Sequence, residues 1–502
     1  MIDFSTPGQY MLALLPEVVL SLWAMLVLLI DVFQKGDRSQ ASSSWIGWLT
    51  LVGVGAAAVA NGWLLTLEEA TPIGMIAIDA FRVFSNFLFL LAAALFVLMS
   101  TRYLDEERLK LGELYVLIML ATVGMMVFAG SRDLMVTFIG LELMSVPVYV
   151  LTGVNRRDSR SAEGALKYFL LGAFSSAFFL YGVALIYGAV GTTNLALIAA
   201  SLGVDGLGAN ALVPVGVALL AVGFGFKVAA IPFHMWTPDA YEGAPAPITA
   251  FMAAAVKAAA FAAFLRVFLT AFPGLYDIWD GIAVWLAVLT MIGANLVAVV
   301  QGNVKRMLAY SSIAHAGYLL VALAAGSVVG SASFLFYLVI YTLMTMGAFA
   351  VVMAVGRPGE AHLELEDYSG LGWRRPLLAT TMTIFLLSLA GFPFTGGFIG
   401  KVFILRAAVE RGLVLLAVVL VLTSLVSYWY YLRVAWFMWF RDPADEPAGG
   451  PIVVPAAMKV MLAGSAVAVV VLGVLPGVLL ELAEHSAVTL LRASGSLFGV
   501  AP

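Results

Sequence analysis

The chain has 502 residues, of which 63% are hydrophobic and 11% are charged, with a formal net charge of −4. Its mean hydropathy of +1.03 excludes an ordinary soluble domain and is typical of a membrane protein that crosses the bilayer many times through α-helices. The lack of cysteine and the scattered positions of the four histidines exclude disulfides and iron–sulfur clusters in this chain and argue against a metal site.

Long apolar runs recur along the whole chain. Because one spanning helix needs roughly 20 apolar residues, the sequence predicts an all-α polytopic membrane protein with about 14 transmembrane helices. These segments lie near residues 10–33, 45–66, 79–99, 113–130, 133–153, 164–189, 213–231, 246–271, 278–300, 308–325, 331–356, 377–405, 412–440 and 455–482. The longest loops have about 20 residues each, too few for a soluble domain.

Basic residues are unevenly distributed between the two sets of alternate loops. One set carries Lys35, Arg38, Arg102, Arg108, Lys110, Arg156, Arg157, Arg160, Lys305, Arg306, Arg357, Arg374, Arg375 and Arg441. The other set carries Arg132, Arg406 and Arg411, with Arg492 in the tail. Since lysine- and arginine-rich loops stay in the cytoplasm or its organellar equivalent, we expect both termini on the outer side of the membrane.

Glu142 is a carboxylate deep inside the apolar segment 133–153. A buried carboxylate needs a partner, and Lys227 is the natural candidate. At a separation of about 4 Å and an effective dielectric constant near 20, the two charges would be coupled by roughly 4 kcal/mol. Separating them would free the lysine to release its proton. The sequence therefore predicts an electrostatic switch, with a permanent structural ion pair as the alternative.

Lys227 lies about one turn before Pro232, at the start of a proline-rich stretch over residues 225–247. Proline removes a helical N–H and disfavours helix in the residue before it. We therefore expect a broken helix here, whose free carbonyls solvate the ammonium. The alternative is a lysine that snorkels to water from an ordinary helix end.

Lys257 lies among alanines, about ten residues from either end of the segment 246–271. A charge at the bilayer centre costs at least a few kcal/mol, and a side chain so far from both ends does not easily reach water. The position therefore predicts a functional group that lines a narrow hydrated passage. A lysine that is buried in its neutral form for packing alone is the alternative.

A second interruption, rich in glycine, lies at residues 390–401 and ends at Lys401. Glycines and Pro393 inside an apolar run predict another broken helix. The two interrupted segments are the seventh and the twelfth, and an offset of five gives them opposite directions in the membrane. That arrangement is expected of inverted repeats around an ion path. An accidental glycine-rich kink is the alternative.

His315 lies within the tenth segment, close to two serines. Histidine titrates near neutral pH, so it could relay protons between Lys257 and Lys401. A core histidine bonded to a neighbouring hydroxyl is an equally good interpretation. Lys305 and Arg306 are more simply a cytoplasmic anchor. Glu113 and Lys167, near cytoplasmic ends, could line an entrance or be solvated interfacial residues.

Three stretches together resemble one family: Phe226–Phe251, Val304–His315 and Gly391–Lys401. This family comprises the antiporter-like subunits of proton-pumping NADH–quinone oxidoreductase, respiratory complex I, and of the related multisubunit cation/proton antiporters. Within it the chain is most similar to the subunit N branch, the counterpart of mitochondrial subunit 2. It ends about 20 residues after the fourteenth segment, too soon for the lateral helix of subunit L, and it has Lys401 where subunit M usually has glutamate.

The resemblance implies an organisation in four parts. An N-terminal three-helix segment covers residues 1–112, and a C-terminal helix and tail cover residues 441–502. Between them lie two inverted five-helix antiporter-like repeats, 113–271 and 278–440, with broken seventh and twelfth helices.

The resemblance also implies roles for five residues. Glu142 and Lys227 would be the switch pair, Lys257 the central relay and Lys401 the terminal site on the far side. His315 matches a histidine-bearing segment only approximately.

A non-redox subunit that moves protons across the cell inner (plasma) membrane, driven by quinone reduction in other subunits, is therefore expected. NAD, FMN, iron–sulfur clusters and quinone are expected in those partner subunits, with no cofactor in this chain. The expected neighbours are an M-like antiporter subunit, a small K-like subunit, the lateral helix of an L-like subunit and lipids, with no nucleic acid. The alternatives are a subunit of a multisubunit sodium/proton antiporter and a membrane scaffold that conducts nothing.

Overall fold

The computed structural model describes residues 2, 4, 6–33, 44–67, 74–107, 109, 112–203, 210–356, 358–442, 452 and 454–492. The basic loop residues Lys35, Arg38, Arg108, Lys110 and Arg357, on which part of the orientation argument rests, lie outside this set. The regular secondary structure of the described part is helical, apart from three isolated β-bridges. The all-α prediction is confirmed.

The α-helices follow the predicted segments in order, with short helices between some of the long ones. They are α1 (Pro7–Ala13), α2 (Leu15–Phe33), α3 (Ser44–Trp63), α4 (Ala80–Glu106), α5 (Gly112–Gly130), α6 (Leu134–Thr152), α7 (Ser159–Val190), α8 (Leu195–Leu202), α9 (Leu212–Lys227), α10 (Thr237–Gly243), α11 (Ala246–Phe251), α12 (Lys257–Ala271), α13 (Tyr276–Val299), α14 (Val304–Ala325), α15 (Val328–Gly356), α16 (Leu371–Arg374), α17 (Pro376–Ala390), α18 (Gly396–Glu410), α19 (Val414–Phe440), α20 (Ala456–Val474) and α21 (Gly477–Arg492). A π-helical turn, η2 (Met252–Val256), joins α11 to α12, and short 3₁₀ turns are η1 (Leu64–Thr66), η3 (Pro273–Leu275), η4 (Pro358–Glu360) and η5 (Leu365–Tyr368).

Within the described residues, twelve helices are long and apolar enough to cross a membrane. Two shorter apolar helices, α9 and α17, belong to the seventh and twelfth predicted segments. Both end where the sequence predicts a break: α9 at Lys227, before the proline-rich stretch, and α17 at Ala390, before a left-handed Gly391. The last predicted segment differs from the structure, because it is divided at Pro476 into α20 and α21.

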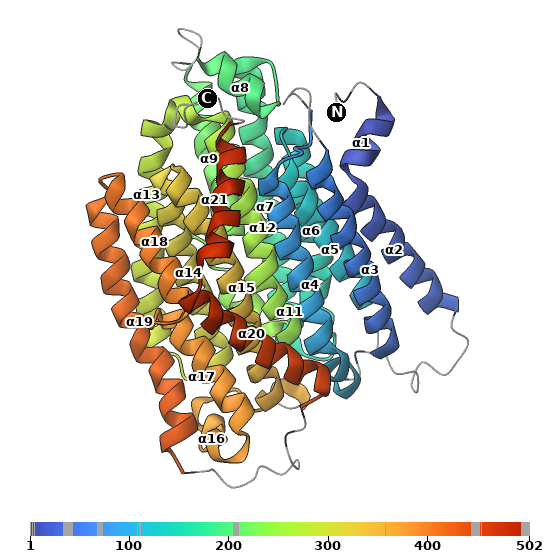
Figure 1. The fold of residues 1–502 in the computed structure, drawn as a ribbon, viewed down its shortest axis with the longest axis vertical. Helices are drawn as coiled ribbons and strands as arrows, with labels where there is room; N and C mark the ends of the chain where they lie inside the picture. The colour runs from blue at the N-terminus through green and yellow to red at the C-terminus, as the bar shows by residue number, and fades with distance from the viewer. Residues whose placement is uncertain are drawn as a thin grey trace.

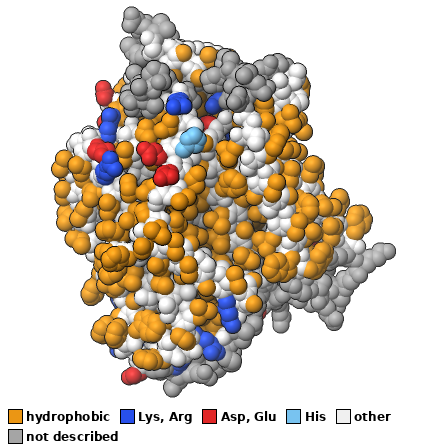
Figure 2. All heavy atoms as spheres, viewed as in Figure 1, with side chains coloured by type: hydrophobic (Ala, Val, Ile, Leu, Met, Phe, Trp, Pro, Cys, Tyr) orange, Lys and Arg blue, Asp and Glu red, His pale blue; other side chains and the backbone are white. Residues whose placement is uncertain are grey.

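The helices stand side by side, with α1 and the end of α21 at the same end of the molecule (Figure 1). The blue helices α2 and α3 form one edge and the orange helix α19 the opposite edge. The red helices α20 and α21 cross between the two halves and pack against both α4 and α15. Hydrophobic side chains cover the middle of the face seen in Figure 2, and charged ones gather towards its two ends.

A buried ionic cluster ties together the ends of several helices. Asp79, just before α4, accepts two hydrogen bonds from the Arg266 guanidinium of α12, at 2.7 and 2.9 Å. The Nε of Arg266 donates to the carbonyl of Ala129 at the end of α5. Arg132 lies 3.6 Å from the same carboxylate. This planar, bidentate geometry suits arginine, which fixes the end of α12 against α4 and α5.

A second buried pair extends this cluster to the first helices. Arg82, on the first turn of α4, pairs with Glu17 of α2 at 2.7 Å and donates to the carbonyls of Ala13 and Ala77. Both charged side chains are buried. The N-terminal helices are therefore joined to the rest of the bundle by ion pairs as well as by apolar packing.

We expect Asp79→Asn to destabilise the chain strongly. The substitution leaves the buried Arg266 without its carboxylate, and breaking a buried pair costs about 3–5 kcal/mol. The free energy of unfolding, followed by thermal denaturation of the purified chain in detergent, should fall by about that amount. Glu410→Gln, which breaks an exposed pair with Arg406, is the control and should cost less than about 1 kcal/mol. Equal losses in the two variants would contradict the assignment.

The same pair sets a pH dependence. Burial acts to raise the pKa of Asp79, but the charges of Arg266 and Arg132 outweigh it and hold this pKa well below its usual range. A lowered pKa gives stability that is fully present above the unfolded value of about 4 and is lost as the pH falls through the folded value. The stability difference between wild type and Asp79→Asn should therefore be constant between about pH 8 and pH 5 and shrink below about pH 4.

Candidate functional site

Lys227 is the last residue of α9 and is almost completely buried. Its Nζ donates to the hydroxyl of Tyr149 on α6 at 3.2 Å. It also lies over the rings of Tyr149 and Tyr168, at 5.0 and 5.2 Å from their centroids. The indole of Trp236 stacks on Tyr168 and donates to the carbonyl of Phe226. The interrupted helix therefore ends inside an aromatic cage rather than in open solvent.

Glu142 lies about two turns before Tyr149 on α6 and is only partly buried. Its carboxylate accepts a short hydrogen bond from Ser176 of α7. Among the described residues no direct ion pair joins Glu142 to Lys227, whose Nζ instead contacts Tyr149. In this structure the partner that the sequence predicted for Lys227 is replaced by a neutral hydroxyl.

Lys257 opens α12, directly after the π-helical turn η2. Its Nζ donates to the hydroxyl of Ser312 at 2.5 Å and to the carbonyl of the same residue at 2.8 Å. Its alanine neighbours Ala255 and Ala258 are fully buried. Ser312 belongs to α14, so this ammonium is held by the following half of the molecule.

His315 lies about one turn after Ser312 on α14 and is buried. Its Nδ1 is 2.6 Å from the hydroxyl of Tyr337 on α15, and its Nε2 is 3.1 Å from the hydroxyl of Tyr431 on α19. The hydroxyl of Tyr431 also makes a short hydrogen bond with Ser311. Both ring nitrogens are thus engaged by hydroxyl groups, which can donate or accept a proton.

Lys401 lies in α18, just after the second interruption, and is buried. Its Nζ donates to the carbonyls of Leu389 and Ala390, the last two residues of α17, at 2.9 and 3.0 Å. The carbonyl end of a helix attracts a cation, so the break supplies here the carbonyl solvation that the sequence predicted for Lys227. The ring of Tyr318 on α14 covers the ammonium at 4.6 Å.

One face of α14 connects the last three of these groups. Ser312, His315 and Tyr318 follow one another at a spacing of three residues, which places them on one side of a helix. They contact Lys257, the Tyr337–Tyr431 pair and Lys401 in turn. Of these three residues only His315 was predicted from the sequence as a relay, although the three-residue spacing of Ser312, His315 and Tyr318 is visible there.

A cavity of about 650 Å³ opens between the ends of α4, α5 and α6. Glu107, Glu113 and Arg157 line it, together with Tyr149, which contacts Lys227. Glu113, a candidate entrance residue from the sequence, therefore lies on a hollow that leads towards the first buried lysine. Lys167, the other candidate, instead pairs with Asp239 and Glu163 at the surface. In the described part of the chain, no group of three or more histidine, aspartate and glutamate side chains could hold a metal ion.

Comparison with known proteins gives consistent matches. Residues 131–427 match the transmembrane family of NADH:quinone oxidoreductase and Mrp antiporter subunits. NADH-quinone oxidoreductase subunit N of Trichlorobacter lovleyi is 47% identical over 473 residues, which cover 94% of this chain and 96% of the relative. Subunit N 1 of Sorangium cellulosum is 46% identical, with 95% and 98% covered.

A solved structure of respiratory complex I from Thermus thermophilus, with bound aureothin, contains a chain of the same fold. It is 35% identical and superposes with a TM-score of 0.79 over 93% of this chain and 99% of that one. Sequence and structure thus agree over nearly the whole length. The chain belongs to the NADH-quinone oxidoreductase subunit N family, the antiporter-like, multi-pass membrane subunits of the complex I translocase.

Proposed function

We propose that this chain is a non-redox subunit that moves protons across the membrane through Lys227, Lys257 and Lys401, driven by quinone reduction in other subunits. One observation carries the proposal. Each of the three buried ammonium groups is held by hydroxyl or carbonyl oxygens, and none is in an ion pair among the described residues. A lysine with neutral partners can lose its proton without leaving a buried carboxylate unpaired.

Lys227 and Glu142 form the proposed switch at the start of the path. The carboxylate rests on Ser176 and the ammonium on Tyr149, so the present arrangement is the separated one. When the two charges approach, lysine holds its proton more strongly; when they separate, it passes the proton on. The cavity beside Tyr149 is the proposed entrance.

Lys257 is the proposed central relay and Lys401 the terminal site on the far side. Hydrogen bonds connect Lys257 to Ser312, and Ser311 to Tyr431, His315 and Tyr337. His315 is the proposed relay along this route, because both of its nitrogens have hydroxyl partners.

The proposed framework has about 14 transmembrane helices, in which α9–α10 and α17–α18 are the broken seventh and twelfth. Two inverted five-helix repeats, 113–271 and 278–440, follow an N-terminal segment, 1–112, and precede the C-terminal part, 441–502. The positions of the two interruptions, five segments apart, support this division.

As a subunit of complex I, the chain assembles with other subunits of that complex. We propose the M-like antiporter subunit, the small K-like subunit and the lateral helix of the L-like subunit as its neighbours, in the cell inner membrane. Both termini would face the periplasm, since α16, which ends at the basic Arg374, lies at the end of the molecule opposite α1 and the end of α21 (Figure 1). NAD, FMN, iron–sulfur clusters and quinone would belong to the partners.

Replacing Lys257 by alanine should stop proton movement through this chain. In the purified complex reconstituted into vesicles, we expect NADH-driven proton uptake to fall about tenfold or more, since a relay without a titratable group has a much higher barrier. Lys459→Ala, which removes an exposed lysine on α20, is the control and should leave uptake unchanged. A scaffold that conducts nothing would pump normally after the Lys257 change, so normal pumping would refute the proposal.

The sodium/proton antiporter alternative is tested by changing the ions. The matched family also includes Mrp antiporter subunits, which is why this alternative needs its own experiment. Vesicles without NADH should show no sodium-dependent proton flux through the complex. Flux of that kind, abolished by Lys257→Ala, would favour the antiporter.

Removing the hydroxyl of Tyr431 should slow the relay through His315. Tyr431→Phe takes away a hydrogen bond worth about 1.5 kcal/mol, so proton uptake should fall roughly tenfold. Tyr430→Phe is a matched control: its hydroxyl is equally buried but bonds Asn295 instead. Similar rates in the two variants would show that the Tyr431 hydroxyl takes no part in proton transfer.

A further inference from the structure

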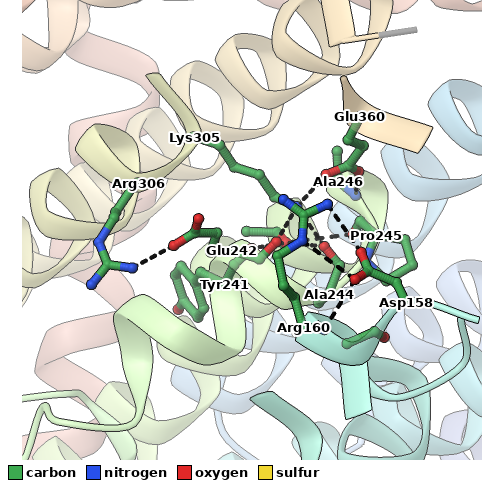
Figure 3. Close-up of polar contacts among 12 residues, drawn as sticks. Asp158, Arg160, Tyr241, Glu242, Ala244, Pro245, Ala246, Lys305, Arg306 and Glu360 are labelled. Carbon is green, nitrogen blue, oxygen red and sulfur yellow. Dashed lines mark hydrogen bonds and ion pairs between the residues drawn. The ribbon is translucent and has the colours of Figure 1, made fainter. Parts of the chain in front are cut away.

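A buried lysine outside the proposed proton path makes contacts that suit a mechanical role. Lys305, on the first turn of α14, is completely buried. Its Nζ donates to the carbonyls of Glu242 and Ala244, at 2.9 and 2.6 Å, and pairs with the Glu360 carboxylate at 2.5 Å (Figure 3). Burial and these three bonds do not fit the interpretation of Lys305 as a cytoplasmic anchor. Its neighbour Arg306, a third exposed, fits that interpretation better.

Glu360 completes the arrangement from the loop that follows α15. One of its oxygens binds Lys305, and the other accepts from the backbone N–H of Ala246 and from the hydroxyl of Tyr103, both at 2.7 Å. Ala246 is the first residue of α11, and Tyr103 lies in the last turns of α4. A single carboxylate thus joins the end of α4, the start of α11 and the start of α14.

The two charges face the helix ends that they suit. Lys305 binds carbonyls at the end of α10, and Glu360 binds the first N–H of α11. Helix ends leave such groups without partners, and a cation is favoured at the carbonyl end and an anion at the amide end. Between them lies the turn Ala244–Pro245. The ion pair therefore contacts this turn on both sides. We call the pair of Lys305 and Glu360 the junction clamp.

The backbone is strained at Glu360, the residue whose carboxylate binds Lys305. Glu360 has a φ of 48° and Gly359 a φ of 77°, and a non-glycine residue in this region is uncommon. The N–H of Gly359 donates to Glu107, which holds the loop against α4. A strained backbone conformation persists only where surrounding contacts hold it in place. The contacts around Glu360 therefore fix the position of its carboxylate.

Lys305 of the clamp and Ser312, which contacts Lys257, lie on one helix. Lys305 and Ser312 are seven residues, about two turns, apart on α14, so they project from the same side. α11 runs through η2 directly into α12, which begins with Lys257. α14 therefore holds this helix at two points, by the clamp at its start and by Ser312 at the ammonium.

We propose that Lys305 and Glu360 are positioning residues, which lock the junction between α10 and α11 and so keep Lys257 against Ser312. The inference rests on the proposed role of Lys257 in proton transfer. Loosening the clamp would let the start of α11 move and would lengthen the contact between Lys257 and Ser312, while leaving every titratable residue of the path in place.

The test compares three variants of the complete complex. In Lys305→Met and Glu360→Gln we expect hydrogen–deuterium exchange over residues 244–257 to rise about tenfold and proton uptake to fall about tenfold. Lys305→Arg, which keeps the charge at the end of α10, should restore uptake to within about twofold of wild type. Unchanged exchange, unchanged uptake, or equal uptake in the Met and Arg variants would overturn the proposal.

Arg306→Gln is the matched control. Arg306 is the next residue and also joins α14 to α10, through Glu242, but its pair is partly exposed. Exposed pairs contribute little, so neither exchange nor uptake should change. Failure of the clamp and failure of the proposed function are distinguishable. If Lys257→Ala blocks uptake while Glu360→Gln pumps normally, the clamp is wrong; if Lys257→Ala pumps normally, the proton path is wrong.

Discussion

The structure depends on one constraint: an ammonium group inside the bilayer must be solvated by the protein. At the centre of a membrane such a charge costs at least about 2.5 kcal/mol, and more when it cannot reach water. In this chain the solvation comes from neutral oxygens, supplied by Tyr149 for Lys227 and by Ser312 for Lys257. Neutral partners stabilise the ammonium but still let the lysine lose its proton, whereas a carboxylate partner would hold the lysine in its charged form.

The broken helices meet this constraint in two ways. At Lys401 the break exposes the last carbonyls of α17, and the lysine binds them directly. At Lys227 the carbonyl of Phe226 instead accepts hydrogen bonds from the Trp236 indole and from the backbone N–H of Ala229. The lysine contacts a hydroxyl and two aromatic rings. Two interruptions that look alike in sequence thus solvate their lysines by different chemistry.

Prediction from the sequence succeeded where the cause is local. Pro232 and Gly391 mark the two interruptions because proline and glycine act on their own backbone. It failed where the cause is distant: Tyr149 is 78 residues from Lys227, and Ser312 is 55 from Lys257. The burial of the three arginines near Asp79 was missed because each lies close to a segment end, where an arginine is ordinarily solvated.

Lys305 shows why position along a segment is a poor guide to burial. It lies at the start of α14, where a solvated cation is expected, yet the turn between α10 and α11 folds over it and provides its acceptors. Further along the same helix, Ser312 contacts Lys257, His315 contacts Tyr337, and Tyr318 contacts Lys401. Because one helix carries all four contacts, the proposed role of Lys305 and Glu360 implies that a movement of the α10–α11 turn would act on Lys257 and leave His315 and Tyr318 in register. The proposed clamp would therefore act at the Lys305 end of α14, where this helix contacts the turn between α10 and α11.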